Sequence, residues 1–181
     1  MKKIILGVSS SIAAYKTYEL VRLFFRQGYQ VQVVLTKNAL KLVSPLTFET
    51  LSGQPVYTDT FAEEKREMGH ISLKDQAALF LVAPATANII GKFASGIADD
   101  LLSTTYLSVT CPVLIAPAMN PNMYSHPAVQ INIKKLLERG VKFIEPKHGH
   151  VACGDLGEGK LSPIEDIFQV ALKLLESGNN K

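Results

Sequence analysis

Short, continuously apolar segments alternate along this chain with stretches of helical periodicity, and this alternation limits the fold more than any other feature. The apolar segments lack the polar alternation of a strand with one face in water, so both faces of their sheet should be covered. The five expected strands are residues 4–8, 31–35, 78–83, 113–116 and 141–144. We therefore predict a doubly wound α/β fold of the Rossmann-like kind, with a mostly parallel sheet and helices on both faces.

Capping residues mark the expected helix boundaries. Ser44 before Pro45 predicts one helix start, and the Ser-Pro-Ile-Glu sequence at residues 162–165 predicts another, with a capping box. The helical region from about residue 86 to 107 should be divided by Gly91 and Gly96. The glycines expected to end other helices are Gly28, Gly53 and Gly140.

Length and composition exclude several classes of protein. With 181 residues, 47% of them hydrophobic, the chain suits one core, so we expect a single domain over residues 1–181. A net charge of +3 without basic runs interleaved with aromatic residues argues against nucleic acid as a partner. The longest apolar run, residues 77–83, is far below the roughly 18 residues of a membrane span. Two cysteines and no clear export signal predict a cytoplasmic protein.

Ligands of open parallel sheets bind in the loops after the carboxyl ends of the strands. The first such loop, residues 7–16, carries three serines at a helix start, and these could cradle a phosphate or simply cap the helix. It lacks the dinucleotide-binding glycines, and Thr36 and Lys37 follow the second strand where a ribose-binding acid would stand. We therefore do not expect a nicotinamide cofactor.

Polar loops also follow the third and fourth strands. Pro-Ala-Thr-Ala-Asn at residues 84–88 places polar groups at a helix start, and Asn120 and Asn122 lie among prolines in residues 117–124. These asparagines could hold a carboxylate or a flavin edge, or they could be turn residues that bond their own backbone.

The glycine-rich residues 148–160 are too long for a simple connection and are expected to form a mobile flap around Cys153. Cys111, before a proline at a strand entrance, is interpreted as a small core residue. No ligand set has the spacing of a metal site, so we expect no metal. His70 alone could be a surface or capping histidine or a base.

Read together, six short motifs resemble those of the flavin-dependent cysteine decarboxylases, above all the branch that acts on 4'-phospho-N-pantothenoylcysteine in coenzyme A biosynthesis. They occur in that family's order and cover nearly the whole chain, and they are specific as a set although each alone is weak. The motifs are G-V-S-S-S-I-A-A-Y-K (7–16), M-G-H-I-S-L (68–73), P-A-T-A-N (84–88), A-D-D-L-L-S-T (98–104), P-A-M-N (117–120) and A-C-G-D-L-G-E-G-K (152–160).

The resemblance implies an FMN cofactor, bound at the boundary between subunits of a homotrimer or of a dodecamer built from trimers. It implies that Asn120 holds the substrate carboxylate, that Cys153 on the flap supplies a proton, and that His70 is the active-site histidine. The residues it places around the cofactor are Ser9, Ser10, Ser11, Thr36, Thr86, Asn88, Ser103, Thr104, Ala118 and Met119.

This chemistry requires an electron acceptor. An N-acylated cysteine has no free amine for a pyridoxal Schiff base, and direct loss of carbon dioxide would leave a poorly delocalised carbanion, which a flavin can avoid. Many bacterial relatives carry a second domain that ligates cysteine to phosphopantothenate. Since 181 residues leave no room for it, we expect that ligase to be a separate polypeptide.

Three other functions remain open at this stage. Peptidyl-cysteine decarboxylases of the lantibiotic type share the histidine and the P-A-M-N asparagine, but the A-C-G flap favours the small-molecule branch. Flavin prenyltransferases share the serine-rich first loop but have no reason to combine M-G-H-I-S-L with P-A-M-N. Phosphatase-regulating relatives bind without catalysis, and the joint presence of His70, Asn120 and Cys153 argues against that role.

Overall fold

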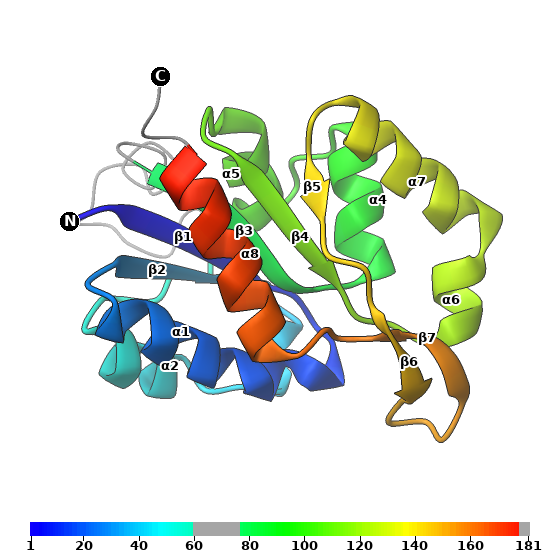
Figure 1. Ribbon diagram of the computed structural model, residues 1–181, viewed down its shortest axis with the longest axis horizontal. Helices are drawn as coiled ribbons and strands as arrows, with labels where there is room; N and C mark the ends of the chain where they lie inside the picture. The colour runs from blue at the N-terminus through cyan, green and yellow to red at the C-terminus, as the bar shows by residue number, and fades with distance from the viewer. Residues whose placement is uncertain (60–76, 178–181) are drawn as a thin grey trace.

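The computed structural model describes residues 1–59 and 77–177, and its centre is a parallel sheet of five strands (Figure 1). The strand order is β2-β1-β3-β4-β5. Successive strands are therefore added toward one edge up to β2 and toward the other edge from β3 on, and we call the position between β1 and β3 the reversal point. The strands are β1 (Lys3–Val8), β2 (Gln30–Leu35), β3 (Ala77–Ala85), β4 (Val113–Pro117) and β5 (Lys142–Phe143).

Helices cover both faces of this sheet, which confirms the doubly wound α/β prediction. On one face lie α1 (Thr17–Arg26), α2 (Pro45–Ser52) and α8 (Ile164–Ser177). On the other lie α4 (Ala87–Ser95), α5 (Leu101–Ser108) and α7 (Pro127–Glu138). Short helical turns η1 (Ile12–Lys16) and η2 (Ala39–Lys41) follow β1 and β2.

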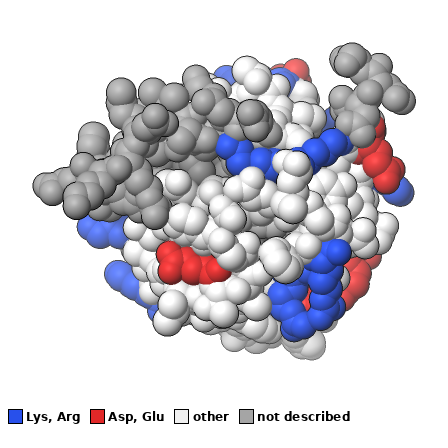
Figure 2. Space-filling model, turned by 90° about the vertical axis from the view of Figure 1, so that its left-hand side faces the viewer, with Lys and Arg blue, Asp and Glu red and all other residues white. Residues whose placement is uncertain are grey.

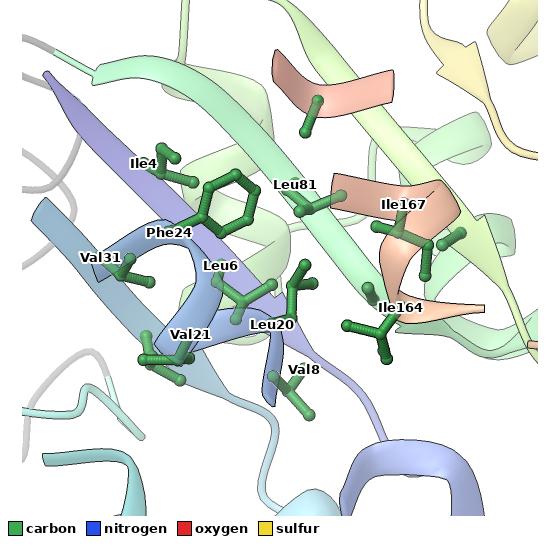
Figure 3. Packing of buried hydrophobic residues seen from close by; sticks show 14 of the residues in the cluster. Ile4, Leu6, Val8, Leu20, Val21, Phe24, Val31, Leu81, Ile164 and Ile167 are labelled. Carbon is green, nitrogen blue, oxygen red and sulfur yellow. The ribbon is translucent and has the colours of Figure 1, made fainter. Parts of the chain in front are cut away.

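Side chains on the two faces of β1 pack in the two hydrophobic clusters on either side of the sheet. Ile4, Leu6 and Val8 point toward α1 and α8, where they pack in the cluster of Figure 3. Gly7 points to the other face, where a Cβ atom would lie 2.5 Å from Cδ1 of Leu102. Glycine at this position therefore allows α5 to pack closely against the sheet.

Most of the predicted helix ends agree with the structure. Gly28, Gly53, Gly96 and Gly140 all have positive φ at or just beyond a helix end, as the sequence predicts. The expected division at Gly91 is wrong, because this glycine lies inside α4 and faces Asn132 of α7.

Two predicted caps form differently. Pro45 begins α2, but the Ser44 side chain makes no capping bond, and the Ser44 backbone N–H instead donates to the Tyr18 hydroxyl at 2.8 Å. Helix α8 begins at Ile164, and the Ser162 hydroxyl donates to the carbonyl oxygen of Glu145.

The glycine-rich flap is an antiparallel hairpin of β6 (Lys147–His150) and β7 (Leu156–Lys160), which the sequence analysis described only as a flap. A short helix, α6 (Pro121–Ser125), was also not predicted, because its five residues follow β4 with the composition of a turn. Figure 1 places the hairpin and α6 together at one end of the molecule.

Charged side chains on the opposite end are scattered. Figure 2 shows the face where β1 begins, and there the visible Lys, Arg, Asp and Glu residues form separate small groups within uncharged surface. Among the helices that the structure describes, none is long and apolar enough to cross a membrane.

Candidate active site

A cavity of about 730 Å³ lies beyond the carboxyl ends of β1, β3 and β4. It is formed by Ser10 and Ser11 with η1, by Thr86 at the start of α4, by the loop from Ala118 to Asn120, and by the flap hairpin. This is the reversal point between β1 and β3, where open α/β sheets bind their ligands. Its volume lies in the range of small-molecule and cofactor sites, roughly 300–1,000 Å³.

Ser9 joins the loop after β1 to the loop after β3. Its hydroxyl donates to the carbonyl oxygen of Pro84 at 2.8 Å and accepts the backbone N–H of Thr86 at 3.0 Å, and its own N–H also donates to Pro84. Because Ser9 is almost fully buried, its hydroxyl is committed to these bonds and fixes where Thr86 stands.

The neighbouring hydroxyls are closer to the cavity. Ser10 and Ser11 line it, and Ser11 also caps η1 by accepting the Ala13 N–H. Thr86 lines it from the start of α4 and accepts the Ile89 N–H. Polar groups therefore gather on the side of the β1 and β3 loops, as the sequence predicts.

The loop after β4 is held on both sides by main-chain bonds. The Ala118 N–H donates to the carbonyl oxygen of Ala85, and the Met119 N–H donates to that of Gly159 on β7, both at 2.9 Å. Gly159 has φ of +145°, and a Cβ atom there would lie 2.3 Å from the Met119 oxygen. Only glycine fits this close approach, so the flap is docked against the loop that carries Asn120.

Asn120, Cys153 and Asp155 form one hydrogen-bonded group at the flap. The Asn120 side-chain Oδ1 accepts the Asn122 N–H at 2.8 Å, which caps α6 and orients the amide. Its Nδ2 then donates to Cys153 Sγ at 3.2 Å and to Asp155 Oδ2. The Cys153 thiol in turn donates to Asp155 Oδ2 at 3.4 Å. The two residues that the sequence analysis named as carboxylate holder and proton donor are therefore in direct contact.

The tip of the flap folds back on itself to present Cys153. The Val151 N–H donates to the Asp155 carbonyl, and the Gly154 N–H donates to the Val151 carbonyl at 2.9 Å. Gly154 has φ of +90°, which lets the chain reverse directly after Cys153. The Cys153 side chain is exposed and lines the cavity.

Seven of the predicted site residues line this one cavity: Ser10, Ser11, Thr86, Ala118, Met119, Asn120 and Cys153. Five others, Ser9 among them, lie outside its lining. Thr36 hydrogen-bonds the Ala39 N–H at the start of η2, and Asn88 is exposed on α4. His70 falls outside the described residues.

Ser103 and Thr104 are engaged at the start of α5. Ser103 is fully buried and forms a capping box with Asp100, while the Thr104 hydroxyl donates to the Asp100 carbonyl at 2.8 Å. Lys92 joins the same group through an ion pair of 2.6 Å with Asp100. Although burial acts in the opposite direction, bonds from Lys92 and Ser103 hold the pKa of Asp100 below its usual value.

Sequence reasoning missed Asp155 and several cavity residues. Asp155 follows Cys153 by only two positions, and its place on a tight turn was the signal that could have paired the two. Met123 and Lys160 also line the cavity, as does Lys16, whose part the sequence left open.

The other cysteine has no part in this cavity. Burial raises the pKa of the Cys111 thiol, in keeping with its interpretation as a core residue, although it is only partly buried.

Within residues 1–59 and 77–177, no cluster of three or more His, Cys, Asp or Glu side chains could hold a metal ion.

The lining of the cavity combines apolar side chains with hydroxyl groups. Ala118 and Ile12 offer apolar contacts, whereas Ser10, Ser11 and Thr86 supply hydroxyl groups on one side. Apolar walls with a few convergent polar groups are typical of cofactor sites.

The fold and the site define an α/β protein with a cofactor-sized cavity at the β1/β3 reversal point, lined in part by a cysteine-bearing flap. Comparison with known proteins makes this class specific: the chain belongs to the Flavoprotein family, whose model matches residues 1–176.

Curated relatives include the coenzyme A biosynthesis bifunctional protein CoaBC. The chain is 50% identical to that of Bacillus subtilis (strain 168) over 173 residues, which is 95% of this chain and 43% of the relative. It is 45% identical to that of Mycobacterium tuberculosis (strain ATCC 25618 / H37Rv) over 175 residues, 97% of this chain and 42% of the relative. The chain thus spans less than half the length of these relatives.

Solved structures of similar proteins superimpose on nearly the whole chain. One is a mutant of PPC decarboxylase complexed with pantothenoylaminoethenethiol, with a TM-score of 0.84 and 28% identity, covering 96% of this chain and 98% of that one. The FMN-dependent cysteine decarboxylase SpaF has a TM-score of 0.83 and 32% identity, covering 98% and 97%. The FMN binding protein AtHal3 has a TM-score of 0.84 and 30% identity, covering 97% of each chain.

Proposed function

We propose that this chain is an FMN-dependent decarboxylase that converts 4'-phospho-N-pantothenoylcysteine to 4'-phosphopantetheine and carbon dioxide in coenzyme A biosynthesis. The observation that carries the proposal is the contact between the Asn120 amide and the Cys153 thiol inside a cofactor-sized cavity. The similarity to CoaBC and to a PPC decarboxylase bound to pantothenoylaminoethenethiol supports this substrate over other cysteine derivatives.

FMN would lie against the residues that line the cavity, with its phosphate near Ser10 and Ser11 and its ring near Ala118 and Met119. When bound, the flavin supplies a two-electron acceptor that later returns the electrons. Ser9 contributes by fixing Thr86. Thr36, Asn88 and Thr104 remain proposed cofactor residues, with the cofactor at a boundary between subunits. Ser103, which is fully buried against Asp100, would act only by holding the start of α5.

Asn120 would hold the substrate carboxylate through its Nδ2 group. In the structure both protons of Nδ2 are used, one toward Cys153 Sγ and one toward Asp155 Oδ2. A bound carboxylate would therefore replace one of these acceptors, and the bond from Asn122 N–H to Oδ1 would keep the amide pointing toward it.

Cys153 would donate its thiol proton to the substrate carbon after carbon dioxide leaves. Its Sγ lies on the docked flap, beside the amide that would hold the carboxylate, so the proton donor and the departing group share one side of the cavity. A docked flap also keeps water away from a reactive carbon. We propose His70 as the third catalytic residue, on the motif alone.

We further propose that the chain acts as one domain, in a homotrimer or in a dodecamer built from trimers. Side chains of Ile97 and Leu107 are about half exposed at the ends of α4 and α5, and contacts between copies would cover such apolar groups. Two free cysteines among the described residues are consistent with a reducing cytoplasm.

The test is a direct comparison of substrates. The purified protein should be yellow, release FMN rather than FAD on denaturation, and produce carbon dioxide from 4'-phospho-N-pantothenoylcysteine but not from a peptide that ends in cysteine. Turnover of the peptide alone would replace the proposal with a peptidyl-cysteine decarboxylase. A colourless protein that cannot be reconstituted with FMN and releases no carbon dioxide would refute the enzyme reading.

Two variants test the residue roles. Asn120→Asp should bind FMN but lose decarboxylation, because a carboxylate would face the substrate carboxylate. Cys153→Ser should release carbon dioxide in one turnover and then stall before the final protonation. Full turnover by Cys153→Ser would remove Cys153 from the proton-donor role.

A further inference from the structure

A second cavity, of about 720 Å³, adjoins the candidate active site. It lies between η1 with the start of α1, the flap hairpin and the first residues of α8. The two cavities share four lining residues, Tyr15, Lys16, Lys160 and Leu161. These four residues therefore lie where the two cavities meet.

The second cavity is lined by more basic than acidic side chains. Lys16, Lys147, Lys160 and His148 line it, against Glu19 and Glu165.

Some of these charges are already paired. Lys147 is bound to Asp166 at 3.2 Å, and Glu19 is bound to Arg22 at 3.5 Å. Within the described part of the chain, the side-chain ammonium groups of Lys16 and Lys160 take part in no ion pair or hydrogen bond.

This pairing leaves the ammonium groups of Lys16 and Lys160 against the single carboxylate of Glu165, a balance that favours an anion. Cations on the wall of a cleft raise the local concentration of negatively charged ligands, and lysine is a common phosphate binder because it acts as a compact point charge. Since both lysines also border the first cavity, the anion should belong to a molecule that extends into the candidate active site.

We propose that the second cavity binds the phosphate monoester of the substrate, with Lys16 and Lys160 as its ion partners. The inference rests on the proposed function, in which the carboxylate and thiol are at one end of a long molecule and the phosphate is at the other. The reacting end lies against Asn120 and Cys153, the pantothenoyl chain passes Tyr15 and Leu161, and the phosphate reaches the lysines.

The second cavity then sets substrate preference. It favours a phosphorylated ligand over the same ligand with a free hydroxyl, without touching the atoms that react. FMN also carries a phosphate monoester, so the experiment must separate the two sources.

The experiment measures binding to the FMN-loaded protein by calorimetry, with 4'-phosphopantetheine and pantetheine as probes. The wild type should bind the phosphorylated probe at least roughly tenfold more tightly, the equivalent of about 1.4 kcal/mol. Lys16→Gln and Lys160→Gln should each lower this ratio several-fold, and the double variant should bring it close to one. Lys→Arg at either position should restore most of the preference, because the charge returns.

Lys135→Gln on α7 is the matched control, since it removes the same charge from the opposite face of the sheet and should leave the ratio unchanged. FMN affinity of each variant, measured by fluorescence, distinguishes the cofactor phosphate from the substrate phosphate. Circular dichroism confirms folding.

Equal affinity of the wild type for both probes would overturn the proposal, as would variants that weaken both probes to the same extent. Loss of FMN affinity with an unchanged ratio would assign the lysines to the cofactor and overturn it too. If the lysines set the ratio but no carbon dioxide is released from the substrate, the phosphate site stands and the decarboxylase proposal fails.

Discussion

Replacing Gly159 with alanine should release the flap from the loop that carries Asn120. The new Cβ atom would lie 2.3 Å from the Met119 carbonyl oxygen, a backbone atom that cannot rotate away. The φ of +145° adds strain of about 1–3 kcal/mol for a non-glycine residue. Loss of the bond from Met119 N–H to Gly159 O costs about another 0.5–1.5 kcal/mol. Docking should therefore weaken by about 1.5–4.5 kcal/mol.

Hydrogen exchange measures this directly, because undocking exposes the Met119 amide to water. Gly154→Ala is the matched control: φ is +90° there, but no atom lies within 4 Å of the added Cβ. It should strain the flap tip and leave the Met119 amide protected. Equal protection of this amide in Gly159→Ala and the wild type would refute the docking argument. Equal exchange in both variants would show that strain, not contact, governs the flap.

Two further changes test the support of the site. Ser9→Ala should lower the free energy of unfolding by about 1–3 kcal/mol in urea, because it leaves the Thr86 N–H without its buried acceptor. Asp100→Asn should cost about 0.5–1 kcal/mol at pH 7 through the ion pair with Lys92. Because folding lowers the pKa of Asp100 from 3.8, this contribution is complete above pH 4 and is lost as the pH falls further. The free energies of unfolding of Asp100→Asn and the wild type should therefore converge in acid.

The sequence predicted the sheet because its strands are apolar throughout, and it placed the site because parallel strands end at a common edge. It could not predict the flap strands, since Lys147–His150 and Leu156–Lys160 are polar and rich in glycine and so carry no strand periodicity. The hairpin also docks through Gly159 against Met119, which is 40 residues away in the chain.

The sequence also could not predict which serine hydroxyl groups support the loops and which face the cavity. Three adjacent serines look alike in the sequence, but Ser9 turns inward to bond Pro84 while Ser10 and Ser11 line the cavity. Ser103 satisfies Asp100 at the start of α5. Which serine is used for support depends on packing across the sheet, and no local pattern reports it.

Main-chain bonds hold the loops of the site to one another. Ser9 N–H bonds Pro84, Ala118 N–H bonds Ala85, and Met119 N–H bonds Gly159, so four segments are joined without using the side chains that face the cavity. Lining side chains can then change while the positions of the loops stay fixed.

Differences in substrate among cysteine decarboxylases should therefore lie in side chains around one scaffold. In this chain the proposed reacting residues, Asn120 and Cys153, lie on the docked loops. Lys16 and Lys160 lie where this cavity meets the second one, which we propose binds the phosphate. A relative that acts on a peptide could keep the first group and lose the second, because a peptide carries no phosphate at that distance. Charge at these two lysine positions is thus the feature that should separate small-molecule from peptide decarboxylases of this fold.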